Sequence, residues 1–173
     1  MSRLSTLIKK ETIMTNIFLE KLNALKDDQK YDFIREVEYE ETDEKWDFFN
    51  TIIANESEYD LARIEALKII GLYEIPDQKK DKIAQSLEHI INNEEDYLVK
   101  NYAVMALKNF TDYQPLVILA KSIVCDSNED ENLRHNALSA IEKLPSGPKK
   151  EILTILLSDK YMKPYAKQIL SEM

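Results

Sequence analysis

Three stretches of the chain repeat one pattern of residue types: LARIEALKIIG at residues 61–71, VKNYAVMALKNF at residues 99–110 and LRHNALSAIEKL at residues 133–144. They align without gaps. In each stretch an alanine follows a basic residue by three positions, and further apolar residues follow at offsets of three and four. This spacing places the apolar side chains on one face of a helix. The pattern predicts three copies of one amphipathic helix, with the alanines at Ala66, Ala103 and Ala137.

A weaker fourth copy begins at Met162 and has Ala166 in the alanine position. Pro164 lies inside it, and because proline is tolerated only in the first turn of a helix, we expect the last helix to begin near Lys163. The three complete copies are each followed by a break, at residues 76–77, 111–112 and 145–148, and then by a second amphipathic stretch near residues 79–91, 114–124 and 149–157. One unit is therefore a predicted helical hairpin, which buries its apolar face by stacking on the next unit.

The composition favours the same class of fold. Glycine occurs twice and proline five times in 173 residues, too few for the many turns of an all-β protein. Hydrophobic residues make up 44% of the chain, an ordinary globular proportion. We predict an all-α protein, a short α-solenoid of about four to five hairpins.

The first helix of each unit resembles the first helix of a HEAT repeat, of the armadillo-type class of helical repeats. The resemblance covers residues 58–173, and it departs from its own pattern at Ile69, where the other copies have Ala106 and Ala140. It implies stacked hairpins that bind another macromolecule. Some enzymes are built on a similar scaffold, and the resemblance therefore also admits an alkylpurine DNA glycosylase or a bilin lyase.

Residues 15–57 are expected to form further helices at residues 15–26, 30–40 and 44–54, with Thr15 or Asn16 as the first N-cap. The last two of these helices could form a degenerate hairpin that opens the solenoid, so residues 15–173 would make one structural domain. Residues 1–14 are a separate N-terminal segment, of which residues 1–13 show no clear pattern. They are either native or a leader or vector-derived extension ahead of a start at Met14.

The negative charge is concentrated in one segment. The net charge is −9, and residues 27–60 hold thirteen acidic and three basic side chains. An acidic surface beside aromatic residues would steer a basic partner and hold it through aromatic anchors. The alternative is a solvated helix face. The candidate partner-binding residues are Glu36, Glu38, Glu40, Glu41, Asp43, Glu44 and Trp46.

No catalytic, cofactor or metal site is expected. His89 and His135 lie in different units, and with only Cys125 available they match no zinc spacing. The run that begins at Asp126 starts like a calcium loop, but Glu131 replaces the required glycine and Ala137 the bidentate glutamate. The repeated basic residues are expected to pair with acidic neighbours in adjacent units.

These observations favour a non-catalytic binding protein with a basic protein partner. The acidic charge argues against nucleic acid, and no apolar run is long enough for a membrane. Immunity proteins, which neutralise toxin domains, share this size, charge and architecture. A single cysteine and the absence of a signal-peptide pattern place the expected protein in the cytoplasm.

Overall fold

The structure is a computed structural model that describes residues 14–173. Helices account for 75% of the described residues and no strand occurs among them, which confirms the all-α class. The chain divides into two compact units, and the boundary along the sequence falls within α5 (Asp77–Asn93): unit 1 extends to Ser86 and unit 2 runs from Leu87 to Met173. The predicted leader at residues 1–13 lies outside the described residues.

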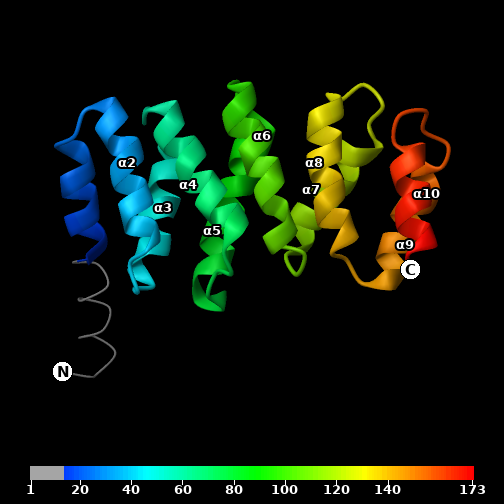
Figure 1. The fold of residues 1–173 in the computed structure, drawn as a ribbon, viewed down its shortest axis with the longest axis horizontal. Helices are drawn as coiled ribbons and strands as arrows, with labels where there is room; N and C mark the ends of the chain where they lie inside the picture. Colours follow the sequence, from blue (N-terminus) through cyan, green and yellow to red (C-terminus); the bar gives the residue numbers. More distant parts are fainter. Residues whose placement is uncertain (1–13) are drawn as a thin grey trace. The chain divides into compact units, whose positions relative to one another are not determined.

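Unit 1 contains a helix at residues 14–23, α2 (Asp27–Glu38), α3 (Glu44–Ala54), α4 (Asp60–Leu72) and the start of α5. Both α2 and α3 pack against α4 (Figure 1). The core of this unit is aromatic: the rings of Phe18 and Phe48 have centroids 5.5 Å apart, and those of Phe48 and Phe49 are 5.6 Å apart. All three side chains are buried, and α3 supplies two of them, Phe48 and Phe49.

The start of the first helix differs from the prediction. Residue 14 is already helical, so Thr15 lies within the helix and does not cap it. Instead, the Thr15 hydroxyl donates a hydrogen bond to the main-chain oxygen of Glu44 at 3.4 Å. This bond connects the first helix to the start of α3. The bounds of α3, Glu44–Ala54, are those predicted from the apolar pattern.

Unit 2 contains α6 (Tyr97–Ala106), a 3-10 turn η1 (Leu107–Asn109), α7 (Gln114–Cys125), α8 (Glu131–Glu142), α9 (Ser146–Leu156) and α10 (Lys163–Ser171). Alternate helices pack together, α6 with α8 and α7 with α9, and so do the sequential pairs α7–α8 and α9–α10 (Figure 1). This is the packing expected of stacked hairpins. The predicted start of the last helix at Lys163 is confirmed, with Pro164 in its first turn.

The alanine register of the repeat is confirmed by burial. Ala66 in unit 1 and Ala103, Ala137 and Ala166 in unit 2 are all fully buried. A methyl side chain at these positions lets a neighbouring helix approach closely, while the larger apolar residues beside it fill the remaining space. The fold therefore depends on small side chains at regularly repeated places.

The basic residues of the repeat behave in different ways. The Nη2 atom of Arg134 lies 2.5 Å from Oδ2 of Asp159, beyond α9, as the expected pairing between units requires. Arg63 is also buried, but its Nη1 atom lies 3.6 Å from Asp60 of the same helix. Lys100 and Lys163 make no ion pair among the described residues, so for them the predicted pairing is wrong.

Candidate functional site

The predicted acidic residues lie at the end of α2, in the following turn and at the start of α3. Glu36, Glu40, Glu41 and Asp43 are exposed, whereas Glu38 and Glu44 are half-buried. The carboxylates of Glu36, Glu40 and Glu41 have no side-chain hydrogen bond or ion pair within the described part of the chain. These three carboxylates are not neutralised by the protein itself and remain available to another molecule.

Two other carboxylates connect this segment to the turn between α4 and α5. The Tyr73 hydroxyl donates a hydrogen bond of 2.5 Å to Glu38, and Gln78 Nε2 donates one of 3.0 Å to Asp43. The bond to the Glu38 carboxylate favours the neutral phenol and raises the pKa of Tyr73. The acidic segment and the α4–α5 turn are therefore one continuous surface of unit 1.

Large apolar side chains are exposed next to Glu38 and Tyr73 in the sequence. Tyr39 is 72% exposed and Leu72 is 69% exposed, and Tyr73, next to Leu72, is 42% exposed. Exposed aromatic rings bordered by carboxylates match the composition of protein-binding sites, where aromatic residues supply much of the affinity. We call this the acidic–aromatic surface, defined by Glu36, Glu38, Tyr39, Glu40, Glu41, Asp43, Leu72 and Tyr73.

The structure corrects the predicted role of Trp46. Its side chain is 4% exposed, and its ring packs edge-on against Phe49 with the centroids 5.9 Å apart. Lys45 covers the ring, with Nζ 5.6 Å from its centroid, and the same Nζ donates a hydrogen bond to the main-chain oxygen of Glu38. Trp46 is therefore a core residue and offers no free ring face to a partner.

Glu44 has a local structural role as well. It lies in the first turn of α3, where a carboxylate interacts favourably with the helix dipole, and Asp47 in the same turn pairs with Lys79 at 2.6 Å. Both the dipole and the half-buried position reduce what Glu44 can offer a partner. The exposed part of the predicted site is therefore the stretch from Glu36 to Asp43.

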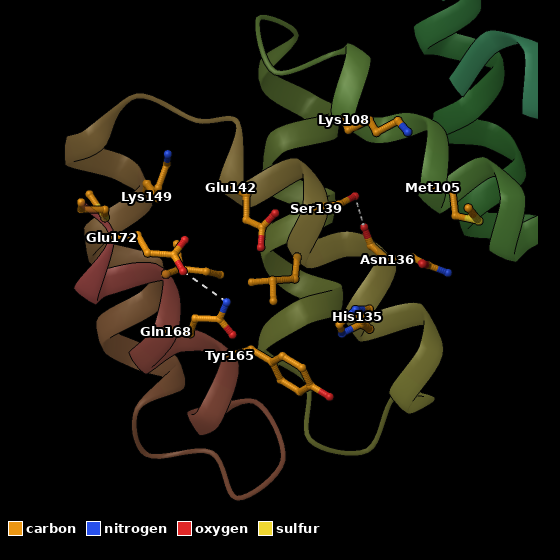
Figure 2. Close-up of a pocket in the computed structure, with 13 residues that line it drawn as sticks. Met105, Lys108, His135, Asn136, Ser139, Glu142, Lys149, Tyr165, Gln168 and Glu172 are labelled. Atoms are coloured by element: carbon orange, nitrogen blue, oxygen red, sulfur yellow. Dashed lines mark hydrogen bonds between the residues drawn. The ribbon is translucent and has the colours of Figure 1, made fainter. Parts of the chain in front are cut away.

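Unit 2 has a separate groove, which the sequence did not reveal. It encloses about 540 Å³ between α8 and α10, with contributions from α6, η1 and α9 (Figure 2). The rings of His135 and Tyr165 meet edge-on with centroids 4.9 Å apart at one end of it. Polar side chains from several helices thus converge on one concave surface.

Two observations on the described residues concern metal binding and thiol chemistry. No three histidine, cysteine, aspartate or glutamate side chains of residues 14–173 are arranged so that they could hold a metal ion. Cys125 is half-buried, and burial raises the pKa of its thiol. A thiol with a raised pKa is a weak nucleophile at neutral pH.

The chain was compared with protein-family models, with curated proteins and with solved structures, and none of them matches it. The resemblance to HEAT repeats stays a prediction from the residues. Over the described residues, no helix has both the length and the apolar content that crossing a membrane requires.

Proposed function

We propose that this chain is a non-catalytic, HEAT-like repeat protein that binds a basic protein through the acidic–aromatic surface. The observation that carries the proposal is the group of exposed carboxylates at Glu36, Glu40 and Glu41, which have no partner in the described chain and flank the exposed Tyr39 in the sequence. Such carboxylates repel one another, and a basic partner would relieve that repulsion.

The distribution of charge supports a role in steering. Residues 27–60 hold thirteen acidic and three basic side chains, and two of those basic groups, Lys30 and Lys45, are held by Glu58 and by the main chain at Glu38. A concentrated field of one sign accelerates the encounter with a partner of opposite charge. It also makes the association rate depend on ionic strength, because the Debye length is about 8 Å at physiological salt.

The exposed apolar groups would give the complex its lifetime. Tyr39, Leu72 and Tyr73 offer contact area that bare carboxylates lack. Apolar and aromatic contacts at the centre of an interface slow dissociation, whereas charges at the rim act on association. The surface therefore has the two components of a protein-binding site.

A toxin domain with a basic surface is the partner class that we propose, with the chain acting as its immunity protein. An inhibitor of this kind needs only to cover the active site of its target, and it needs no catalytic group of its own. The cytoplasm is the proposed compartment, in agreement with a single half-buried cysteine.

The first experiment is a pull-down from the native host with the tagged full chain, followed by mass spectrometry. Association kinetics with the captured protein are then measured at two salt concentrations, for the wild type and for Glu36→Gln/Glu40→Gln/Glu41→Gln. We expect the triple variant to associate more slowly and to show a weaker salt dependence, because long-range attraction acts on the on-rate. Folding should be unaffected, since exposed carboxylates contribute little to stability.

A matched control changes the same number of exposed carboxylates elsewhere: Asp81→Asn/Glu95→Gln/Glu131→Gln. It alters the net charge equally but leaves the acidic–aromatic surface intact. If both triple variants slow association equally, overall charge and not this surface is responsible. If the Glu36→Gln/Glu40→Gln/Glu41→Gln variant keeps the on-rate and salt dependence of the wild type, the acidic segment is only a solvated helix face and the proposal is wrong.

A further inference from the structure

The groove of unit 2 follows from one small residue in the repeat. Met105, Ser139 and Gln168 each lie two positions after the repeat alanine, on α6, α8 and α10 respectively, and all three line the groove. The outer two side chains are long, whereas the middle one is a serine. The hollow therefore lies over Ser139 (Figure 2), and the buried Leu138 also lines it.

The two ends of the groove differ in chemistry. His135 and Tyr165 form an aromatic end, and Glu142 and Glu172 lie seven residues later on α8 and at the end of α10. Seven residues of helix span about 10 Å, so the charged end is about that far from the rings. Lys108 and Lys149 also line the groove, so its four charged side chains sum to zero.

The middle of the groove presents hydrogen-bond acceptors and donors from two side-chain amides. Asn136 donates through Nδ2 to Asn101 at 2.8 Å, and Gln168 donates through Nε2 to Glu172 at 3.2 Å. One N–H of each amide is thus used within the protein, while the second N–H and the side-chain oxygen have no partner among the described residues. A side-chain amide with a free oxygen and a free N–H can accept the N–H and donate to the C=O of a polypeptide main chain.

We propose that this groove binds an extended peptide segment of another protein, with an aromatic side chain against His135 and Tyr165. An extended chain advances about 3.3 Å per residue, so a distance of about 10 Å places a charged or polar residue about three positions from the aromatic one. A volume of about 540 Å³ is in the range of sites that enclose ligands. The balanced charge distinguishes this site from the acidic–aromatic surface, and neither proposal depends on the other.

The test is a selection from a phage-displayed random dodecapeptide library on the full chain. Enriched peptides are synthesised and titrated against the wild type and against Ser139→Tyr, which fills the hollow, with Ser127→Tyr as the matched control. Ser127 is an exposed loop residue that does not line the groove. We expect peptides with an aromatic residue and no excess of basic residues, which bind Ser139→Tyr at least about tenfold more weakly and Ser127→Tyr unchanged.

A second variant guards against misfolding of Ser139→Tyr. His135 is exposed, so His135→Ala removes half of the aromatic end with little effect on the core, and His89→Ala on α5 is its control. We expect only His135→Ala to weaken the aromatic peptides. The proposal is overturned if the selection enriches no peptide over the Ser139→Tyr protein, or if the enriched peptides bind wild type and both groove variants equally.

Discussion

The guanidinium of Arg134 joins α7, α8 and the loop before α10 through three hydrogen bonds. Its Nη2 atom donates to Oδ2 of Asp159 at 2.5 Å, and both Nε and Nη2 donate to the main-chain oxygen of Val124 near the end of α7. Asp159 also accepts the main-chain N–H groups of Tyr161 and Met162. The bonds to Val124 join α8 to the preceding hairpin, and the bond to Asp159 joins α8 to the loop between α9 and α10.

We predict that Arg134→Leu destabilises the protein by about 3–5 kcal/mol, because it removes the countercharge of a shielded carboxylate and leaves Oδ2 of Asp159 and the main-chain oxygen of Val124 without their donor. Arg134 is buried and Asp159 is mostly so. Urea denaturation at neutral pH measures the free energy of unfolding. Lys121→Leu is the control, since Lys121 pairs with Glu151 on the surface and its loss should cost less than about 1 kcal/mol. Equal losses in the two variants would contradict a special role for Arg134.

The same network predicts a pH dependence. Burial alone would raise the pKa of Asp159, but the hydrogen bonds from Met162, Arg134 and Tyr161 together with the charge of Arg134 outweigh it and hold the pKa below its usual value of 3.8. A depressed pKa in the folded state contributes stability above the unfolded value, and this contribution is lost as the pH falls through the folded pKa. Between neutral pH and about pH 3, the wild type should therefore lose more stability than Asp159→Asn. If the two proteins lose equal free energy of unfolding, the Asp159 carboxylate is not the source of the pH dependence.

Lys100 occupies, in the preceding repeat hairpin of unit 2, the position that Arg134 occupies in its own hairpin. It makes no comparable hydrogen-bond network. It lines a cavity of about 220 Å³ together with Asp126, which follows α7 as Asp159 follows α9, and with Ile91 and Asn92 near the end of α5. We predict that Lys100→Arg fills this space and raises the free energy of unfolding by about 0.5–1.5 kcal/mol through added hydrogen bonds.

Lys100→Met is the matched comparison, because it keeps the length of the side chain but supplies no donor. Thermal denaturation of the three proteins separates the two contributions. If Lys100→Met stabilises as much as Lys100→Arg, the gain comes from apolar packing, and the equivalence of Lys100 and Arg134 within the repeat is wrong.

Ala103 tests the packing between the repeat units. We predict that Ala103→Leu costs about 1–3 kcal/mol, because three additional carbons enter a fully packed contact between helices. Leucine and alanine both favour helices, so helix propensity contributes little. Ala54→Leu, at the exposed end of α3, is the control and should be nearly neutral. A neutral result at Ala103 would contradict the alanine register.

The regular parts of this fold could be predicted because they depend on local spacing. The alanine positions, the breaks between hairpins and the start of α10 are all properties of short stretches of sequence. Trp46 could not be placed in this way, since α3 buries residues on more than one face, with Trp46 and Phe49 on one and Phe48 and Ile52 on another. The apolar pattern of such a helix does not show which aromatic ring is available to a partner.

Tyr73 shows a second limit. It aligns with Phe110 and Leu144, which are buried, yet it is partly exposed. The helix before Tyr73 ends at Leu72 and Tyr73 itself is extended, whereas the chain before Phe110 continues as a 3-10 turn. The groove over Ser139 could not be predicted from the sequence either, because it is formed by helices that are separate in the sequence and come together only in the folded chain. Neither irregular helix ends nor packing between neighbouring hairpins can be predicted from a local sequence pattern.

Tyr39 provides the last prediction, which separates the apolar part of the acidic–aromatic surface from the charged part. Tyr39→Ala should leave folding intact, because the side chain is 72% exposed. If its ring is an anchor for the basic partner, the variant should dissociate at least about fivefold faster, a loss of about 1 kcal/mol, with its association rate and salt dependence nearly unchanged. That is the opposite of the result expected for the triple glutamine variant, in which association slows and dissociation changes less.

Surface plasmon resonance with the captured partner measures both rates, and Tyr97→Ala is the control. Tyr97 is an exposed tyrosine of unit 2 whose hydroxyl donates a hydrogen bond to Asp130 at 2.7 Å, and it lies outside the acidic–aromatic surface. A dissociation rate that increases only for Tyr39→Ala would assign the lifetime of the complex to this ring. If neither tyrosine variant changes the dissociation rate, the carboxylates alone attract the partner and the contacts that hold it lie elsewhere on the chain.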